Sequence, residues 1–154
     1  MSITSLLVEN RIFSQDDISS KKRLLEFIAE KAAEELELPQ SAIYNKLLER
    51  ERLGSTGLGQ GIAVPHARLD NLTEAHACLV KLHEGVNYDA VDKQNVDLIF
   101  ALFIPEESTE EHLQILAALA KIFSQKPVTD KIRNSNSAEE IISHIQQAEL
   151  TQLI

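Results

Sequence analysis

The sequence predicts an α/β domain in which a mixed central β-sheet is flanked by α-helices. Two helical patterns come first, apolar strand-like runs occupy the middle, and helices with clear starting signals follow. Because helices and strands do not alternate regularly, a mixed sheet fits this order better than a doubly wound parallel sheet. A length of 154 residues without internal repeats or linkers is typical of one domain, expected to span residues 1–154.

The first third of the chain carries two helical patterns. The stretch "LLVENRIF" precedes them and is expected to form a short strand or a turn of helix. Apolar residues then recur at helical spacing across residues 24–36, and Ser20 can cap this helix. Pro39 ends the first helix and can open a second, because proline is tolerated in the first turn of a helix. Gly54 is expected to stop the second helix.

Three apolar stretches in the middle of the chain predict strands. "IAVPHA" is short and is interrupted by Pro65, and "AHACLVKLH" alternates loosely between apolar and polar residues. "VDLIFALFI" is a continuous apolar run between Asn95 and Pro105, a pattern typical of a buried strand. We therefore expect this last run to lie inside the sheet.

Two capping-box patterns predict helices in the last third. Ser108 and Glu111 form the first box, and Ser137 and Glu140 form the second. Each box precedes apolar residues at helical spacing. Between the two predicted helices, "KPVTDKIRN" is expected to make a short helix of its own.

The acidic composition limits the class of partner. The formal net charge is −9. Binding to a nucleic-acid backbone needs a basic face, so a nucleic-acid partner is not expected. A basic protein or a small ligand suits an acidic domain better.

The location is expected to be cytoplasmic. Glu9 and Arg11 interrupt the apolar stretch after Met1, so no secretory signal is expected, and no run reaches the ~18 apolar residues that a membrane span needs. Cys78 is the single cysteine and lies in an apolar run, which favours a buried structural thiol in a reducing compartment.

The stretch "GSTGLGQGIAVPHAR" at residues 54–68 is the most unusual part of the sequence. Four of the five glycines of the chain fall in its first eight residues. A dinucleotide-binding loop would open a helix and a P-loop would end in Gly-Lys-Ser/Thr, and neither pattern is present. A flexible connection is the plain interpretation. The sharper one is a donor-rich loop that admits positive φ and close approach, beside a His66 that the rigid Pro65 presents for chemistry.

Two of the five histidines are candidates for that chemistry. His66 follows the glycine stretch, and His112 lies in the first turns of its helix, where free N–H groups and the helix dipole favour an anion. His76, His83 and His144 are expected to be ordinary core or surface residues, because no other functional group converges on them.

Three stretches of the sequence resemble a known family. "GSTGLGQGIAVPHA", with Arg50 and Glu51 just before it, resembles the active-site segment of bacterial phosphoenolpyruvate-dependent phosphotransferase system (PTS) IIA domains. The fructose/mannitol type, which includes the nitrogen-regulatory (IIA-Ntr) branch, is the most similar. "YDAVDKQNVDLIFALFIPEESTEEHLQILAALAKIF" and "KIRNSNSAEEIISHI" are also similar to this family, so the resemblance extends from about residue 20 to the end.

The resemblance implies a phosphoryl relay. The position that matches the phosphorylated histidine of the family is His66, and His112 matches a second histidine that helps to orient the first and to hold the phosphate. Arg50, sixteen residues before His66, matches the arginine of the family, with Arg52 as a nearby second candidate. A neutral imidazole can attack phosphorus while donors stabilise the charge on the equatorial oxygens.

The resemblance also implies phosphate-binding hydroxyls on Ser55 and Thr56. The family usually has a glycine where this chain has Ala67, so the backbone there is expected to avoid positive φ. A zinc site on His66 and His112 would lack a third and fourth ligand, so no metal or cofactor is expected.

Three functions remain open from the sequence. The first is a nitrogen-regulatory PTS EIIA type-2 phosphoprotein. It would accept a phosphoryl group on His66 from a histidine phosphocarrier protein (HPr/NPr-like). It would then signal by phosphorylation-dependent binding to target proteins such as potassium transport proteins or sensor kinases. The second is the IIA component of a fructose- or mannitol-class transporter that passes phosphate to a IIB domain. The third is a binding domain without phosphotransfer. Leu58 and Ile62 are the candidates for an apolar carrier-docking patch, although Ile62 is expected to belong to the core.

Overall fold

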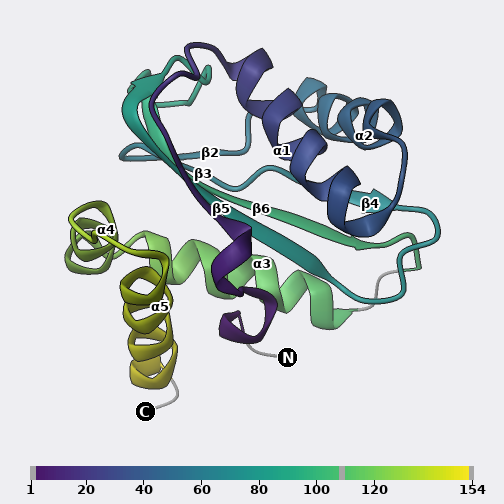
Figure 1. The fold of residues 1–154 in the computed structure, drawn as a ribbon. Coiled ribbons are helices and arrows are strands. Elements are labelled where there is room, and N and C mark those ends of the chain that lie inside the picture. The colour runs from purple at the N-terminus through teal and green to yellow at the C-terminus, as the bar shows by residue number, and fades with distance from the viewer. Residues whose placement is uncertain (1–2, 108–109, 153–154) are drawn as a thin grey trace.

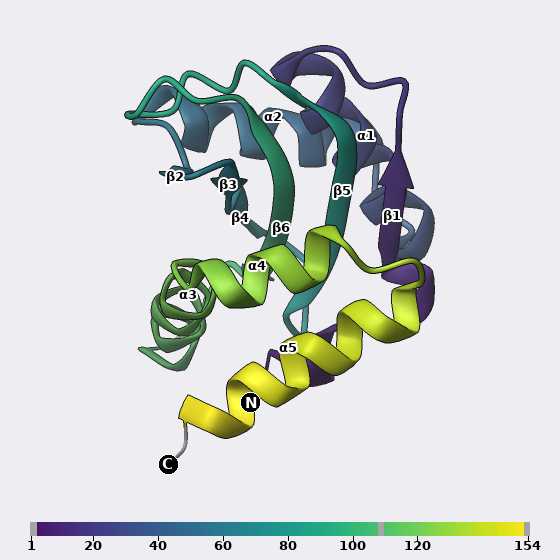
Figure 2. The same ribbon diagram turned by 90° about the vertical axis from the view of Figure 1, so that its left-hand side faces the viewer.

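The computed structural model describes residues 3–107 and 110–152, and the side chains of residues 111, 112 and 152 lie outside this description. In chain order the elements are η1 (Thr4–Leu6), η2 (Glu9–Arg11), β1 (Ile12–Gln15), α1 (Lys21–Leu36), α2 (Gln40–Arg52), β2 (Gly57–Gly59), β3 (Ile62–Ala63), β4 (His66–Leu69), β5 (His76–Val86), β6 (Val96–Pro105), α3 (Glu110–Phe123), α4 (Lys126–Arg133) and α5 (Ala138–Gln152). Helices α1 and α2 cover one face of the sheet, and α3 and α5 lie on the other side (Figures 1 and 2). The predicted α/β class, with a mixed sheet flanked by helices, is confirmed.

Strand β6 is the centre of the sheet. The described strands form a six-stranded sheet in the order β1-β5-β6-β3-β2, and β4 also pairs with β6. β6 is antiparallel to β5 and parallel to both β3 and β4. The apolar run predicted as a buried strand is therefore paired on both edges.

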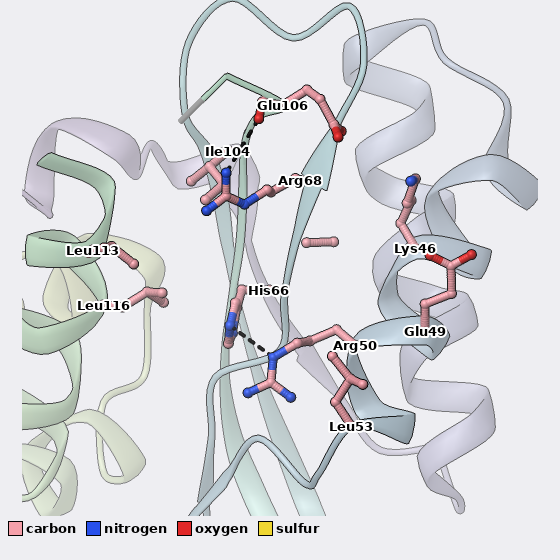
Figure 3. Close-up of a pocket in the computed structure, with 11 residues that line it drawn as sticks. Lys46, Glu49, Arg50, Leu53, His66, Arg68, Ile104, Glu106, Leu113 and Leu116 are labelled. Carbon is pink, nitrogen blue, oxygen red and sulfur yellow. Dashed lines mark hydrogen bonds between the residues drawn. The ribbon is translucent and has the colours of Figure 1, made fainter. Parts of the chain in front are cut away.

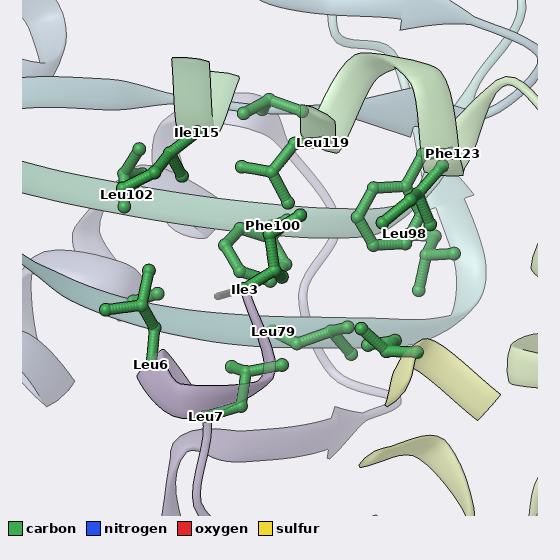
Figure 4. Close-up of a cluster of buried hydrophobic side chains, with 14 of the residues drawn as sticks. Ile3, Leu6, Leu7, Leu79, Leu98, Phe100, Leu102, Ile115, Leu119 and Phe123 are labelled. Atoms are coloured by element: carbon green, nitrogen blue, oxygen red, sulfur yellow. The ribbon is translucent and has the colours of Figure 1, made fainter. Parts of the chain in front are cut away.

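Alternate side chains of β5 and β6 divide the core into two layers. On the side of α3, α4 and α5, the inward residues pack with η1 and the three helices; those from the two strands are Ala77, Leu79, Leu98, Phe100, Leu102 and Ile104. Figure 4 shows Phe100 between Ile3 and Leu119 in this layer. The opposite layer packs against α1 and α2 and contains Cys78, Val80, Leu82, Ile99, Ala101 and Phe103. Two-sided burial explains the continuous apolar runs of β6 from Leu98 to Ile104 and of β5 from Ala77 to Val80.

The predicted helix signals are largely confirmed. The Oγ of Ser20 accepts a hydrogen bond from the Arg23 amide at 3.1 Å, and α2 begins directly after Pro39. The amide of Glu140 donates to the Oγ of Ser137 at 3.1 Å. The box of Ser108 and Glu111 lies outside the described residues and side chains. Helix α4 confirms the short helix expected between the other two.

Pro39 marks the end of α1 as expected, but the conformation of the residue that closes the helix had no signal in the sequence. Glu37 closes this helix in the left-handed conformation with φ +57°, a place where glycine is usual. The stretch "LLVENRIF" contributes both of the alternatives expected for it, because η2 leads directly into β1.

Cys78 is buried as expected, and burial raises the pKa of its thiol to about 12. Within residues 3–107 and 110–152, every helix is too short or too polar to cross a lipid bilayer.

Replacing Leu119 by alanine is expected to reduce the free energy of unfolding by roughly 2–5 kcal/mol, because the change leaves a cavity beneath α3. Leu119 is fully buried, whereas Leu150 on α5 is 52% exposed. Leu150→Ala is therefore the matched control and should change stability little. Chemical denaturation followed by circular dichroism measures both variants, and equal losses would contradict the assignment of Leu119 to the core.

Candidate functional site

The glycine stretch folds as a tight hairpin of β2 and β3. Gln60 and Gly61 form its turn, with φ +57° and +83°, which glycine adopts readily. The Asp92 carboxylate accepts a hydrogen bond from the Gln60 amide at 2.8 Å, and the Arg133 guanidinium donates one to the Gln60 carbonyl at 2.9 Å. A Cβ on Gly57 would lie only 2.9 Å from the Cβ of Ala90, so this glycine permits a close approach. The hairpin is thus a fixed structure and not the flexible connection of the plain interpretation.

Pro65 divides one apolar segment into β3 and β4, and β4 begins at His66. The Leu102 amide donates to the Pro65 carbonyl at 3.0 Å, and His66 is in register with Leu102. Ala67 has no positive φ, as expected. The central strand therefore holds the backbone of His66, and the half-buried side chain faces α2 and α3 (Figure 3).

Both ring nitrogens of His66 have a hydrogen-bond partner. Nδ1 lies 2.9 Å from the Val64 carbonyl oxygen, which can only accept, so Nδ1 carries the proton. Nε2 accepts a hydrogen bond from Nε of Arg50 at 3.2 Å, shown as a dashed line in Figure 3. The neutral ring thus presents the lone pair of Nε2, and Arg50 covers it.

The surroundings keep the His66 imidazole neutral. Burial lowers the pKa of His66 below its ordinary value, and the positive charge of Arg50 adds to this effect. The hydrogen bond to the Val64 carbonyl and the negative charge of Glu51 act in the opposite direction without reversing the shift. At neutral pH the ring is therefore unprotonated at Nε2, as a nucleophile must be.

Arg50 reaches His66 from the last turn of α2. Its Nη1 donates to the Gly54 carbonyl at 2.9 Å, so the guanidinium joins the end of the helix to the start of the glycine loop. Arg52, the second candidate, is exposed on the same turn. Of the two arginines, it is Arg50 that the structure brings to His66.

A cavity of about 380 Å³ opens beside His66 and Arg50. Its walls come from α2, β4, the end of β6 and the first turns of α3 (Figure 3); the lining residues are Lys46, Glu49, Arg50, Leu53, His66, Ala67, Arg68, Ile104, Glu106, Leu113 and Leu116. Leu53 is 85% exposed and Leu113 is 57% exposed. The imidazole therefore lies in a hollow whose rim carries exposed apolar side chains.

The remaining predicted site residues differ in how the structure places them. His112 lies in the first turn of α3, next to Leu113, but its side chain is outside the description. The Oγ of Ser55 accepts from the Gly57 amide at 3.1 Å and donates to the Tyr88 carbonyl at 3.3 Å. The Thr56 hydroxyl is buried against Glu51 and Tyr88. Binding of phosphate by Ser55 and Thr56 stays a prediction.

Leu58 and Ile62 are placed as the sequence analysis expected. Leu58 is 47% exposed on β2, and Ile62 is buried in the core. Leu58 thus remains a candidate for contact with a partner.

A buried polar cluster around Glu51 was missed by the sequence analysis. The carboxylate of Glu51 is 9% exposed and contacts Lys21, Thr56 and Tyr88, which come from three different segments. Burial and the nearby carboxylate raise the pKa of Tyr88 well above its ordinary value. The only signal for this cluster was a charged residue at an inward position of the α2 pattern, four residues after Leu47.

No group of three or more histidine, cysteine, aspartate or glutamate side chains arranged to hold a metal ion occurs among the described residues.

The chain is similar to known proteins along nearly its whole length. A family model described as "Phosphoenolpyruvate-dependent sugar phosphotransferase system, EIIA 2" matches residues 5–148. The chain is 39% identical over 152 residues to a nitrogen regulatory protein of Escherichia coli (strain K12), covering 98% of this chain and 93% of that protein. It is 31% identical over 124 residues to a "PTS system fructose-specific EIIA component" of Haloferax volcanii, covering 80% of each. The solved structure of nitrogen regulatory protein IIA-Ntr from Neisseria meningitidis matches with a TM-score of 0.88 and 38% identity, covering 93% of this chain and 98% of that one.

The ring of His66 is expected to titrate below its ordinary pKa of 6.5. Arg50→Gln should raise that pKa, because it removes the positive charge of the guanidinium that lies beside Nε2. Between the lowered pKa and 6.5, the free energy of unfolding should fall as pH falls, since the unfolded chain takes up the proton first. An NMR titration of the histidine ring signals measures the shift, with the exposed Arg52→Gln as the control. A wild-type midpoint at or above 6.5 would contradict the arrangement.

Proposed function

The chain belongs to the EIIA 2 family of the phosphoenolpyruvate-dependent sugar phosphotransferase system, and from this premise we propose that it is a nitrogen-regulatory phosphoprotein that is phosphorylated on Nε2 of His66. The observation that carries the proposal is the pair of hydrogen bonds on His66, which leaves Nε2 as the unprotonated nitrogen. The donor is a histidine phosphocarrier protein (HPr/NPr-like).

The transfer is a displacement at phosphorus. The lone pair of Nε2 forms the new N–P bond while the N–P bond of the carrier histidine breaks, and the electron pair of that bond returns to the carrier nitrogen. The proton on Nδ1 stays in its hydrogen bond to the Val64 carbonyl, which stabilises the positive charge that the ring acquires. No metal or cofactor is needed for this exchange.

Arg50 has two successive partners in this reaction. Nε2 cannot bond to phosphorus and accept the Arg50 hydrogen bond at the same time, so the guanidinium must move to the phosphoryl oxygens. Its second hydrogen bond, to the Gly54 carbonyl, lies outside the reacting atoms and keeps the guanidinium near His66. Arg50 thus stabilises the charge on the equatorial oxygens during transfer.

His112 and the hydroxyls of Ser55 and Thr56 are proposed as further phosphate contacts. The first turn of α3 supplies Leu113 to the cavity beside His66, which supports a place for residue 112 at the same end. A helix N-terminus and a second imidazole both suit a phosphoryl group. Ser55 suits the role better than Thr56, because its hydroxyl donates to the Tyr88 carbonyl at a long 3.3 Å in a part-buried position, whereas the buried hydroxyl of Thr56 donates to the Glu51 carboxylate.

Two exposed leucines that line the cavity, Leu53 and Leu113, together with the exposed Leu58 on β2, are proposed as the contact for the carrier. Leu53, Leu58 and Leu113 are exposed and apolar on a chain with a net charge of −9. Apolar side chains in the centre of an interface with charged groups at the rim are typical of protein–protein recognition. The charged residues that line the cavity have both signs, with Lys46, Arg50 and Arg68 against Glu49 and Glu106, so a carrier with an apolar patch and charges of both signs around it would suit this surface.

We propose that the output is phosphorylation-dependent binding to target proteins, such as potassium transport proteins or sensor kinases, in the cytoplasm. A phosphoryl group adds roughly −1.5 to −2 charge at the rim of the cavity, which changes the attraction for a charged partner. We also infer that residues 1–154 act as one EIIA domain, since the family match spans residues 5–148. The second candidate function is transfer from His66 to a IIB domain for a sugar, which the similarity to the fructose-specific EIIA component favours.

Incubation with phosphoenolpyruvate, enzyme I and a histidine carrier is expected to place an acid-labile phosphoryl group on the wild type and none on His66→Ala. Arg50→Gln should slow the transfer by about 10²–10³-fold, because one donor to the developing charge is lost, and His112→Ala should slow it as well. Single-turnover transfer of radiolabelled phosphate measures these rates.

His144→Ala is the matched histidine control for this assay. Unlabelled wild type, with a carrier that phosphorylates another acceptor, would contradict the proposal and leave a domain that only binds. Onward transfer to an added IIB domain would instead favour the transport role.

Leu53→Asp and Leu58→Asp are each expected to raise the KM for the carrier about tenfold, equivalent to roughly 1.4 kcal/mol, with little change in kcat. Leu150→Asp is the control, because this exposed leucine lies on α5, which contributes no described residue to the lining of the cavity or to the β2–β3 hairpin. Unchanged kinetics for both test variants would remove this face from the carrier interface.

A further inference from the structure

We propose that Glu51 is a positioning residue for the phosphoryl acceptor, because its buried carboxylate is connected to Nδ1 of His66 through Thr56 and Val64, and its backbone carbonyl is connected to Nε2 through Gly54 and Arg50. This inference rests on the function proposed above for His66. It assigns a role in that reaction to a residue that does not itself touch the imidazole.

The Glu51 carboxylate joins four segments of the chain. Lys21, at the start of α1, forms an ion pair with Oε2 at 2.8 Å. The Thr56 amide donates to Oε2 at 3.3 Å, and the Thr56 hydroxyl donates to Oε1. The Tyr88 hydroxyl, from the segment after β5, donates to Oε1 at 3.0 Å. Breaking such a buried, paired carboxylate is costly, so these segments hold fixed positions relative to the end of α2.

The first connection runs from Glu51 to Nδ1 of His66. Thr56 is held by Glu51 through its amide and its hydroxyl. The Thr56 carbonyl accepts the Val64 amide at 3.0 Å, and the Val64 carbonyl accepts the Nδ1 proton of His66 at 2.9 Å. The position of the carbonyl that selects the ring tautomer therefore depends on Thr56, and Thr56 depends on Glu51.

The second connection runs from Glu51 to Nε2. Arg50 is the neighbouring residue on the last turn of α2, and its Nε donates to Nε2 while its Nη1 donates to the Gly54 carbonyl. The amide of Gly54 in turn donates to the Glu51 carbonyl at 3.1 Å. By holding the end of α2 against the loop, Glu51 sets the place from which the guanidinium reaches the imidazole.

The charge of Glu51 acts separately from these contacts. Its negative charge raises the pKa of His66, in opposition to burial and to Arg50. Removing that charge would favour the neutral ring, but it would also withdraw a negative charge from the positive charge that the ring acquires on attack. A loss of rate in Glu51→Gln alone would therefore combine charge and geometry, and the ring tautomer and the variant Thr56→Val, which keeps the Glu51 charge, separate the two.

The test compares Glu51→Gln and Thr56→Val with the wild type by two measurements. The first is the ¹⁵N chemical shifts of the His66 ring, which report how far the proton resides on Nδ1 in the free protein. The second is steady-state transfer from the phosphorylated carrier. We expect both variants to show a mixed tautomer and a kcat reduced about 10- to 100-fold, as for a slightly misplaced reacting group. The KM for the carrier should stay within about twofold.

Two control variants separate positioning from general damage. Glu149→Gln removes a carboxylate on α5 that, like that of Glu51, accepts several hydrogen bonds. Its donors are the backbone amides of Ile3 and Thr4 and the hydroxyl of Thr4. Thr56→Ser keeps the hydroxyl that donates a hydrogen bond to Glu51, so in contrast to Thr56→Val it should show the wild-type tautomer of His66. A role of Thr56 in binding phosphate would change kcat without changing the ¹⁵N shifts of the phosphate-free protein.

Wild-type ¹⁵N shifts and kcat in Glu51→Gln would overturn the inference. If Glu51→Gln does not fold, Thr56→Val, which retains the Glu51 carboxylate, decides the question: wild-type ¹⁵N shifts and kcat in that variant would overturn the inference. If the wild type accepts no phosphoryl group, the proposed function fails, and the ¹⁵N shifts alone still decide whether Glu51 positions His66.

Discussion

The site depends on the interruption of one sheet segment at Val64 and Pro65. Residues 62–69 keep one register beside β6, and the Pro65 carbonyl accepts the Leu102 amide, so the carbonyl of the residue before it, Val64, faces away from β6. Pro65 has no amide proton to donate, and β4 resumes only at His66. The Val64 carbonyl instead accepts the Nδ1 proton of the residue two positions later. The Val64 carbonyl, which faces away from β6, thus defines the tautomer of the histidine and the nitrogen that is left to react.

The break is tolerated because the surroundings are rigid. β6 pairs with β5 along its length and carries β3 and β4 on its other edge, between two apolar layers. The β2–β3 hairpin is anchored from opposite sides by Asp92 and Arg133. An active side chain on a strand next to a buried central strand has little freedom to move, which lowers the entropy that must be lost to reach a reactive geometry. Among the described residues, the hydrogen bond that a phosphoryl group on Nε2 must replace comes from the guanidinium of Arg50.

The features that could be predicted from the sequence depend on residues that are close together in the chain. Ser20, Pro39 and Ser137 mark helix starts by side-chain or ring chemistry that acts within three residues, and the apolar run before Pro105 marks a buried strand. The order of strands, and the contact of Arg50 with His66, depend on pairings between distant segments, for which the residues themselves give no periodic signal. Arg50 was identified only because its motif resembles a family. Glu51 stands in the same motif, but its partners Lys21 and Tyr88 are 30 and 37 positions away, so its burial could not be predicted.

A phosphoryl group on His66 would act as a local signal on this rigid frame. The reaction replaces one hydrogen bond, from Arg50 to Nε2, while the contacts of Glu51 and the Val64 carbonyl do not involve the reacting atoms. Nothing in the sheet or in the two core layers has to repack. The change that a partner would detect is therefore the added negative charge and the new position of one guanidinium, beside the exposed Leu53. A partner can distinguish the two states by charge at close range, because an interface that covers the cavity excludes water and strengthens the electrostatic difference.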